Sequence, residues 1–145
     1  MTINTIGMLA ALTTLITIAF GHVMVRELEF RLASLRPAIF TCVILGIGFM
    51  MAALVVETNS FSAIFGILGI TFLWDALEFY RQQKRVIKGH APANPGNPRH
   101  QKYLSQYPSA TIVNLTGREP RGYPFTDEEI NSILNPLTQQ GENSQ

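Results

Sequence analysis

Two carboxylates and a histidine are the side chains of this sequence that could carry proton or cation chemistry. Asp75 and Glu78 stand three residues apart in an apolar stretch, so a helix would present both on one face. His22 and Arg26 stand four apart at the end of another apolar stretch and would also share a face. Histidine titrates near neutral pH, and acidic groups inside a membrane are costly unless they are paired. We therefore predict that these four residues form one charge cluster.

The predicted cluster has a functional and a structural interpretation. It could move protons or a cation, but such a pathway needs polar groups that continue to the other membrane face. The middle of every apolar stretch offers only scattered threonines. Alternatively, the charges clamp helices together, with Glu78 paired to Arg81 or Gln82 and the long side chains reaching toward the interface. The structural interpretation is favoured, because interfacial charges near helix ends are ordinary.

Three apolar runs of twenty residues are predicted to position these groups. They cover residues 6–25, 37–56 and 61–80, and a helix needs ~20 residues to cross the hydrocarbon. All eleven Lys and Arg fall between the first and second runs or after the third. The positive-inside rule then predicts a multi-pass membrane protein with its N-terminus outside and its C-terminus in the cytoplasm. Fourteen residues of the third run precede Asp75, so both carboxylates are expected near the cytoplasmic boundary.

The segment between the first two runs, residues 26–36, is predicted to form a separate interfacial helix. Its leucines recur at helical spacing and make one apolar stripe. Glu27 precedes Arg31 by four residues, which is the favourable order for an intrahelical ion pair. An amphipathic helix of this kind lies on the membrane surface.

The chain after the third run is predicted to be cytoplasmic. Gly89 suits the end of the third helix, which closes a transmembrane domain of residues 1–89. Three prolines in residues 90–102 favour an extended basic linker. Residues 103–145 are expected to be a mostly irregular tail with a short capped helix at about 127–134. The predicted fold class is an all-α integral membrane protein with three transmembrane helices, the interfacial helix and this cytoplasmic tail.

Aromatic and basic side chains near the end of the third run suit the layer of lipid headgroups. Trp74 and Tyr80 are typical of the aromatic belt at a membrane interface. Four cations follow within eight residues of the run: Arg81, Lys84, Arg85 and Lys88. Anionic headgroups attract such cations by ~1 kcal/mol each. Nucleic-acid binding is disfavoured, since no aromatic residues interleave with these cations and the topology already explains them.

The sequence contains no catalytic or metal-binding motif that we recognise. There is no phosphate-binding glycine loop of the Walker type, no His-Glu-x-x-His and no Gly-x-Ser-x-Gly. His90 and His100 have no cysteine partner and no zinc-like spacing, so both are predicted to be solvated loop residues. We therefore expect no enzyme, no metal and no cofactor.

Several short motifs lie around the third run: Phe72-Leu73-Trp74, Glu78, Arg85-Val86-Ile87-Lys88-Gly89, Asn94-Pro95 and Pro98-Arg99. Earlier in the chain, His22 ends the first run, Glu27 or Glu29 lies in the connection, and Pro37 begins the second run. Together these motifs resemble a family of small, uncharacterised bacterial membrane proteins, catalogued as a domain of unknown function, over about residues 4–100. The resemblance implies a compact three-helix membrane protein, and it brings no assigned reaction or catalytic residue.

Together with the resemblance, these observations predict a small non-catalytic accessory or scaffold subunit of the bacterial inner membrane, which packs against a partner membrane protein or against itself. Small residues four apart, such as Cys42 with Gly46 and Gly48 with Ala52, favour close helix packing in lipid. The tail helix is a candidate docking element for a cytoplasmic partner. The alternative is a small oligomeric transporter of protons or cations that uses the charge cluster. A third possibility, an enzyme acting on lipid, requires a lipid-sized cavity between the first and third helices.

Overall fold

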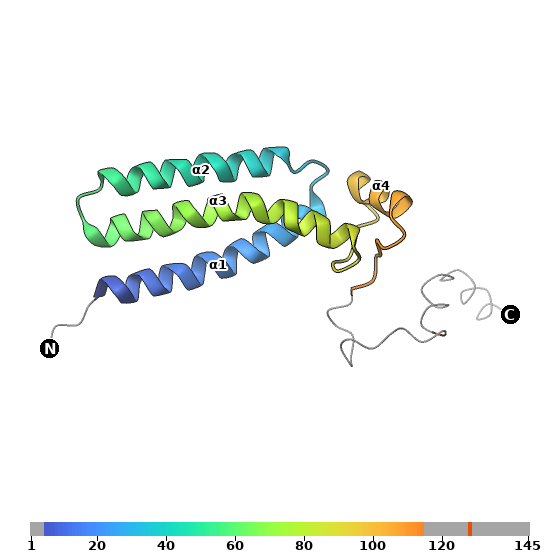
Figure 1. Cartoon of the computed structure of the whole chain (residues 1–145), viewed down its shortest axis with the longest axis horizontal. Coiled ribbons are helices and arrows are strands. Elements are labelled where there is room, and N and C mark those ends of the chain that lie inside the picture. The colour runs from blue at the N-terminus through green and yellow to red at the C-terminus, as the bar shows by residue number, and fades with distance from the viewer. Residues whose placement is uncertain (1–4, 115–127, 129–145) are drawn as a thin grey trace.

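The computed structural model describes residues 5–114 and Glu128, and four helices lie within them. These are α1 (Thr5–Arg31), α2 (Arg36–Val55), α3 (Asn59–Ile87) and α4 (Pro98–Gln106). The described residues contain no strand. The three long helices lie side by side with α3 between α1 and α2, and α4 lies beyond one end of them (Figure 1).

The three long helices are each long and apolar enough to cross a membrane. The shortest, α2, has 20 residues, which at 1.5 Å per residue extend about 30 Å. Each helix coincides with one of the predicted runs to within a residue or extends beyond it. For the residues that the structure describes, the prediction of an all-helical fold with three potential membrane spans is therefore confirmed.

Residues 26–31 do not form the predicted separate interfacial helix. They are the last turns of α1, which is continuous to Arg31, and a short non-helical connection leads to α2. The predicted ion pair between Glu27 and Arg31 is present within α1. The apolar stripe that suggested a surface helix packs instead on a protein core, whose buried members are Val25, Leu35, Cys42 and Phe79. Protein, rather than the membrane surface, therefore covers this stripe.

The predicted extended linker, residues 90–102, is also wrong in part, because α4 begins inside it. Asn97 caps α4 by accepting a hydrogen bond from the Arg99 N–H at 3.0 Å. Pro98 takes the first helical position, where its missing N–H costs nothing. Tyr103 of α4 then packs with Val86 of α3, so this segment folds back onto the helical domain.

The predicted end of α3 is correct, whereas the predicted tail helix cannot be compared in full. Gly89 follows α3 with φ 74°, a left-handed conformation that glycine adopts readily. The His90 N–H returns to the Arg85 carbonyl at 2.8 Å and closes the helix end. The tail helix at about 127–134 lies outside the described residues except for Glu128, which is helical and exposed.

Glycines set the distance at which α2 approaches α3. A Cβ at Gly46 of α2 would lie 2.7 Å from the Leu73 side chain, and one at Gly69 of α3 would lie 2.9 Å from the Met50 backbone nitrogen. These glycines let the two helices approach closely, as small residues do in membrane bundles.

Candidate functional site

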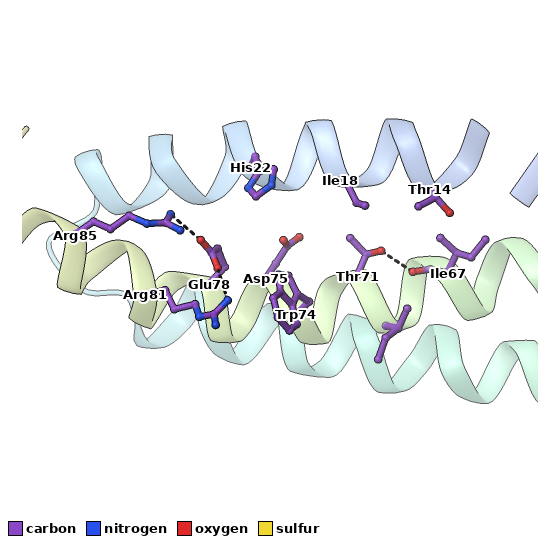
Figure 2. A pocket seen from close by; sticks show the side chains of 11 residues that line it. Thr14, Ile18, His22, Ile67, Thr71, Trp74, Asp75, Glu78, Arg81 and Arg85 are labelled. Atoms are coloured by element: carbon purple, nitrogen blue, oxygen red, sulfur yellow. Dashed lines mark hydrogen bonds and ion pairs between the residues drawn. The ribbon is translucent and has the colours of Figure 1, made fainter. Parts of the chain in front are cut away.

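A pocket of about 590 Å³ lies between α1 and α3 (Figure 2). One part of its wall is apolar, formed by Ile18, Ile67 and Ile70 with nearby threonines. The other part carries all the ionisable side chains: His22, Asp75, Glu78, Arg81 and Arg85. Three of the four predicted cluster residues therefore line one pocket. The pocket also has the location that a lipid-directed enzyme would require.

Asp75 is the most unusual member of the pocket. Its carboxylate points from α3 toward α1 (Figure 2), and a Cβ at Gly21 would lie 2.6 Å from its Oδ1. The glycine thus makes the room that the carboxylate occupies. Asp75 is only 6% exposed, yet within residues 5–114 it accepts no hydrogen bond and forms no ion pair. A buried carboxylate without a partner is rare, because removing it from water is costly.

Glu78 differs from Asp75 because two arginines of its own helix compensate its charge. It is 4% exposed, and its Oε1 lies 2.7 Å from Nη1 of Arg85. This contact is not aligned as a hydrogen bond, so it acts mainly through charge. Arg81 lies 3.7 Å from Oε2, and Arg85 also donates to Gln82 Oε1 at 3.0 Å. The predicted pairing of Glu78 with Arg81 is present, but Arg85 is the closer partner.

His22 and Arg26 do not meet the carboxylates together. His22 points from α1 into the pocket on the side of Asp75 and Glu78 (Figure 2). Arg26 lines a separate pocket of about 230 Å³, together with Glu29 and other residues near the end of α1. The prediction of a four-residue cluster is therefore wrong for Arg26, since α3 itself supplies the cations that pair with Glu78.

Two pairs of the predicted headgroup residues form cation–π contacts within α3. The Arg81 guanidinium lies 5.1 Å from the centre of the Trp74 ring, and Lys84 Nζ lies 4.4 Å from that of Tyr80. Both rings are more than half exposed. Lys88 is also exposed. The contact of all these aromatic and basic residues with lipid headgroups stays a prediction.

The threonines near the pocket do not extend the ionisable cluster into a chain of free hydroxyls. Thr14, Thr17 and Thr71 each donate to a carbonyl of their own helix at 2.7–2.8 Å. The Thr17 and Thr71 hydroxyls also approach each other to 3.5 Å between α1 and α3. Thr71 and Asp75 line a second, apolar pocket of about 420 Å³ as well.

A second polar site, which the sequence did not predict, joins α4 to the end of α1. Glu29 is 1% exposed, and its Oε1 accepts from Arg99 Nη1 at 2.9 Å and meets His100 Nε2 at 3.0 Å. His100 Nδ1 accepts from the Asn94 N–H at 2.8 Å, so its proton is on Nε2 and is donated to Glu29. His100 is fully buried, which makes its predicted solvation wrong, whereas His90 is exposed as predicted.

The same segment satisfies the carbonyls that end α1. The Asn94 amide donates to the Phe30 carbonyl at 3.1 Å, and the Asn97 amide donates to the carbonyls of Phe30 and Leu32 at 3.1 and 3.0 Å. Arg99 adds a cation at this helix end, where the carbonyls and the macrodipole are negative. We call residues 94–100 the collar of α1. The collar contains the motifs Asn94-Pro95 and Pro98-Arg99, which contributed to the family resemblance.

The fold and the pocket define a small protein with three potential membrane-spanning helices and a partly charged pocket between two of them. The chain belongs to the DUF4491 family, described as a domain of unknown function, whose profile matches residues 4–97. This confirms the predicted membership of an uncharacterised family. The match includes the three long helices and Asn97, and it ends immediately before α4. No curated protein and no solved structure matches the chain.

Proposed function

We propose that this protein is a non-catalytic accessory or scaffold subunit of a bacterial inner membrane, and that the outer face of α2 packs against a helix of a partner or of a second copy. The observation that carries the proposal is Gly48. A Cβ at this position would meet no atom within 4 Å, whereas a Cβ at Gly46 of the same helix would meet α3. Gly48 therefore has no packing role within the described residues.

The surroundings of Gly48 suit helix packing in a membrane. Ile44, Met51 and Val55 lie on the same outer face and are 53%, 57% and 76% exposed. A glycine between larger apolar side chains makes a shallow notch, into which the ridge of another helix fits. Lipid chains would fill such a notch less well than a complementary helix.

Substitution of Gly48 tests this proposal. Gly48→Leu fills the notch and is expected to abolish crosslinking between a photoreactive residue at Met51 and its partner in native membranes. The matched control is Gly66→Leu, since a Cβ at Gly66 also meets no atom within 4 Å but lies on α3. Mass spectrometry of the crosslinked product identifies a partner or a second copy. Unchanged crosslinking in Gly48→Leu would refute the proposed interface.

The proposed orientation places the N-terminus outside and α4 with the tail in the cytoplasm, following the positive-inside rule. Its test uses single cysteines in a Cys42→Ala background, because Cys42 is the native free thiol. An impermeant maleimide added to intact cells should label Thr58→Cys and leave Lys102→Cys unlabelled until the cells are lysed. Thr58 and Lys102 are both exposed, so the reverse pattern would overturn the orientation.

The second candidate function is a small oligomeric transporter of protons or cations. The observation in its favour is Asp75, a buried carboxylate without a bonded partner in a pocket that His22 and Glu78 also line. Reconstituted protein should then move protons or a cation down a gradient, and Glu78→Gln and Asp75→Asn should each abolish the flux. Transport that persists in both variants would exclude this use of the carboxylates.

A further inference from the structure

We propose that the pocket between α1 and α3 binds a hydrophobic amine, whose protonated nitrogen pairs with the carboxylate of Asp75. The proposal concerns binding and is independent of the accessory role. It also names a cargo class for the transport alternative, but binding can be measured whether or not transport occurs.

Asp75 is the acidic residue of the pocket that has no hydrogen bond or ion pair within the described residues, although His22 is near enough to interact with it through charge. Glu78 is compensated by Arg81 and Arg85 at 3.7 and 2.7 Å. Asp75 is 6% exposed, and no hydrogen bond or ion pair joins it to His22 or to another side chain in the described part of the chain. A carboxylate at this depth is stabilised by a cation that also donates hydrogen bonds. A protonated amine supplies both.

The remainder of the pocket suits the apolar body of such a ligand. Ile18, Ile67 and Ile70 line the part away from the ionisable residues, and Ile70 is 59% exposed in the isolated chain. The volume of about 590 Å³ lies within the range of small-molecule sites. A short alkyl chain can therefore lie along the isoleucines while its ammonium group reaches Asp75.

The order of the charges along α3 argues against a phospholipid in this pocket. From the apolar part toward the end of α3, the wall presents first Asp75, then Glu78, and then Arg81 and Arg85. A phospholipid with its chains on the isoleucines would place its phosphate, which lies next to the chains, near Asp75. Any ammonium group of its headgroup would then lie near the arginines. Both contacts would be repulsive, whereas an amine carries its positive charge next to its apolar tail.

The test uses Trp74, the only tryptophan of the chain, which lines the pocket. The full chain in lipid nanodiscs is titrated with octylamine, and the fluorescence of Trp74 is followed. Octanol and octanoate serve as neutral and anionic probes of the same length. We expect a saturable change with octylamine, and an affinity lower by about ten- to hundredfold for octanol because the charged hydrogen bond is missing. Equal affinity for octylamine and octanol would overturn the proposal.

Two variants keep the test decisive. Asp75→Asn should weaken octylamine binding by about ten- to hundredfold and leave octanol binding unchanged. Ile18→Phe narrows the apolar part while Asp75 is retained, and it should weaken both probes. The matched control is Ile44→Phe, the same change on the outer face of α2. If Asp75→Asn does not fold by circular dichroism, Ile18→Phe decides, and unchanged octylamine binding in either folded variant would refute the site.

Discussion

Replacing Arg99 by alanine is expected to release α4 from the end of α1. The Arg99 side chain is 13% exposed and bonds to the carboxylate of Glu29, which is 1% exposed, and to the Glu29 and Leu32 carbonyls. Removing one partner of a buried ion pair costs about 3–5 kcal/mol, because the other charge remains buried. His100 would still donate a hydrogen bond to Glu29. The expected loss of stabilisation at the α1–α4 contact is therefore near the lower end of that range, at about 3 kcal/mol.

This loss should appear as local opening of α4 and not as unfolding of the whole chain, since α4 lies at the end of the bundle (Figure 1). A free energy of about 3 kcal/mol raises the open population of α4 about a hundredfold. Hydrogen exchange of the α4 amides, measured by mass spectrometry on the protein in nanodiscs, reports this population. The control is Lys102→Ala, which removes an exposed cation from the same helix. Exchange that changes by less than about threefold in Arg99→Ala, or equally in both variants, would refute the reasoning.

Three further substitutions test the collar and the helix contacts. Asn97→Ala removes the cap of α4 and two bonds to carbonyls at the end of α1, and should raise α4 exchange through a loss of about 1–3 kcal/mol. Gly21→Leu forces a side chain onto the carboxylate of Asp75 and should lower thermal stability by about 1–3 kcal/mol, with loss of the contact between α1 and α3. In thermal unfolding, Gly69→Leu should lower the midpoint because its side chain would meet the backbone of Met50 in α2. The control Gly66→Leu should leave the midpoint unchanged, since a Cβ there meets no atom within 4 Å.

The three long helices could be predicted because their signal is local. Twenty consecutive apolar residues indicate a spanning helix whatever the rest of the chain does, and the structure has such a helix at each run. That Asp75 and Glu78 lie on the same face of α3 also follows from their separation by three residues. Their position opposite His22 required only the expectation that the first and third helices run at the same depth. Local periodicity and membrane thickness together therefore predicted that His22, Asp75 and Glu78 would lie near one another, but not the apolar wall of the pocket.

The collar could not be predicted from local pattern, because its hydrogen-bond partners lie far away in the sequence. The first half of α4, residues 98–102, lies in the polar, proline-containing segment 90–102, so it reads as solvated linker. It becomes an ordered helix because Glu29 and the last carbonyls of α1 lie where Arg99 and His100 can reach them. Glu29 in turn reads as a surface acid until α4 covers it. Each side of this contact looks exposed without the other.

The cations near the end of the helices divide into two groups once their partners are known. Arg31, Arg81, Arg85 and Arg99 each form an ion pair with a glutamate of the described chain. Three exposed lysines in this region form no ion pair within the described residues: Lys84, Lys88 and Lys102. The positive-inside rule counts both groups alike, because acidic residues contribute little to orientation. These arginines pair within the chain whatever their part in the proposed orientation, whereas the three lysines are the expected contacts of anionic headgroups. Substituting the lysines should weaken lipid contact while the helices stay packed. Substituting Arg99 should release α4 from the end of α1 and leave the lipid contact of the lysines unchanged.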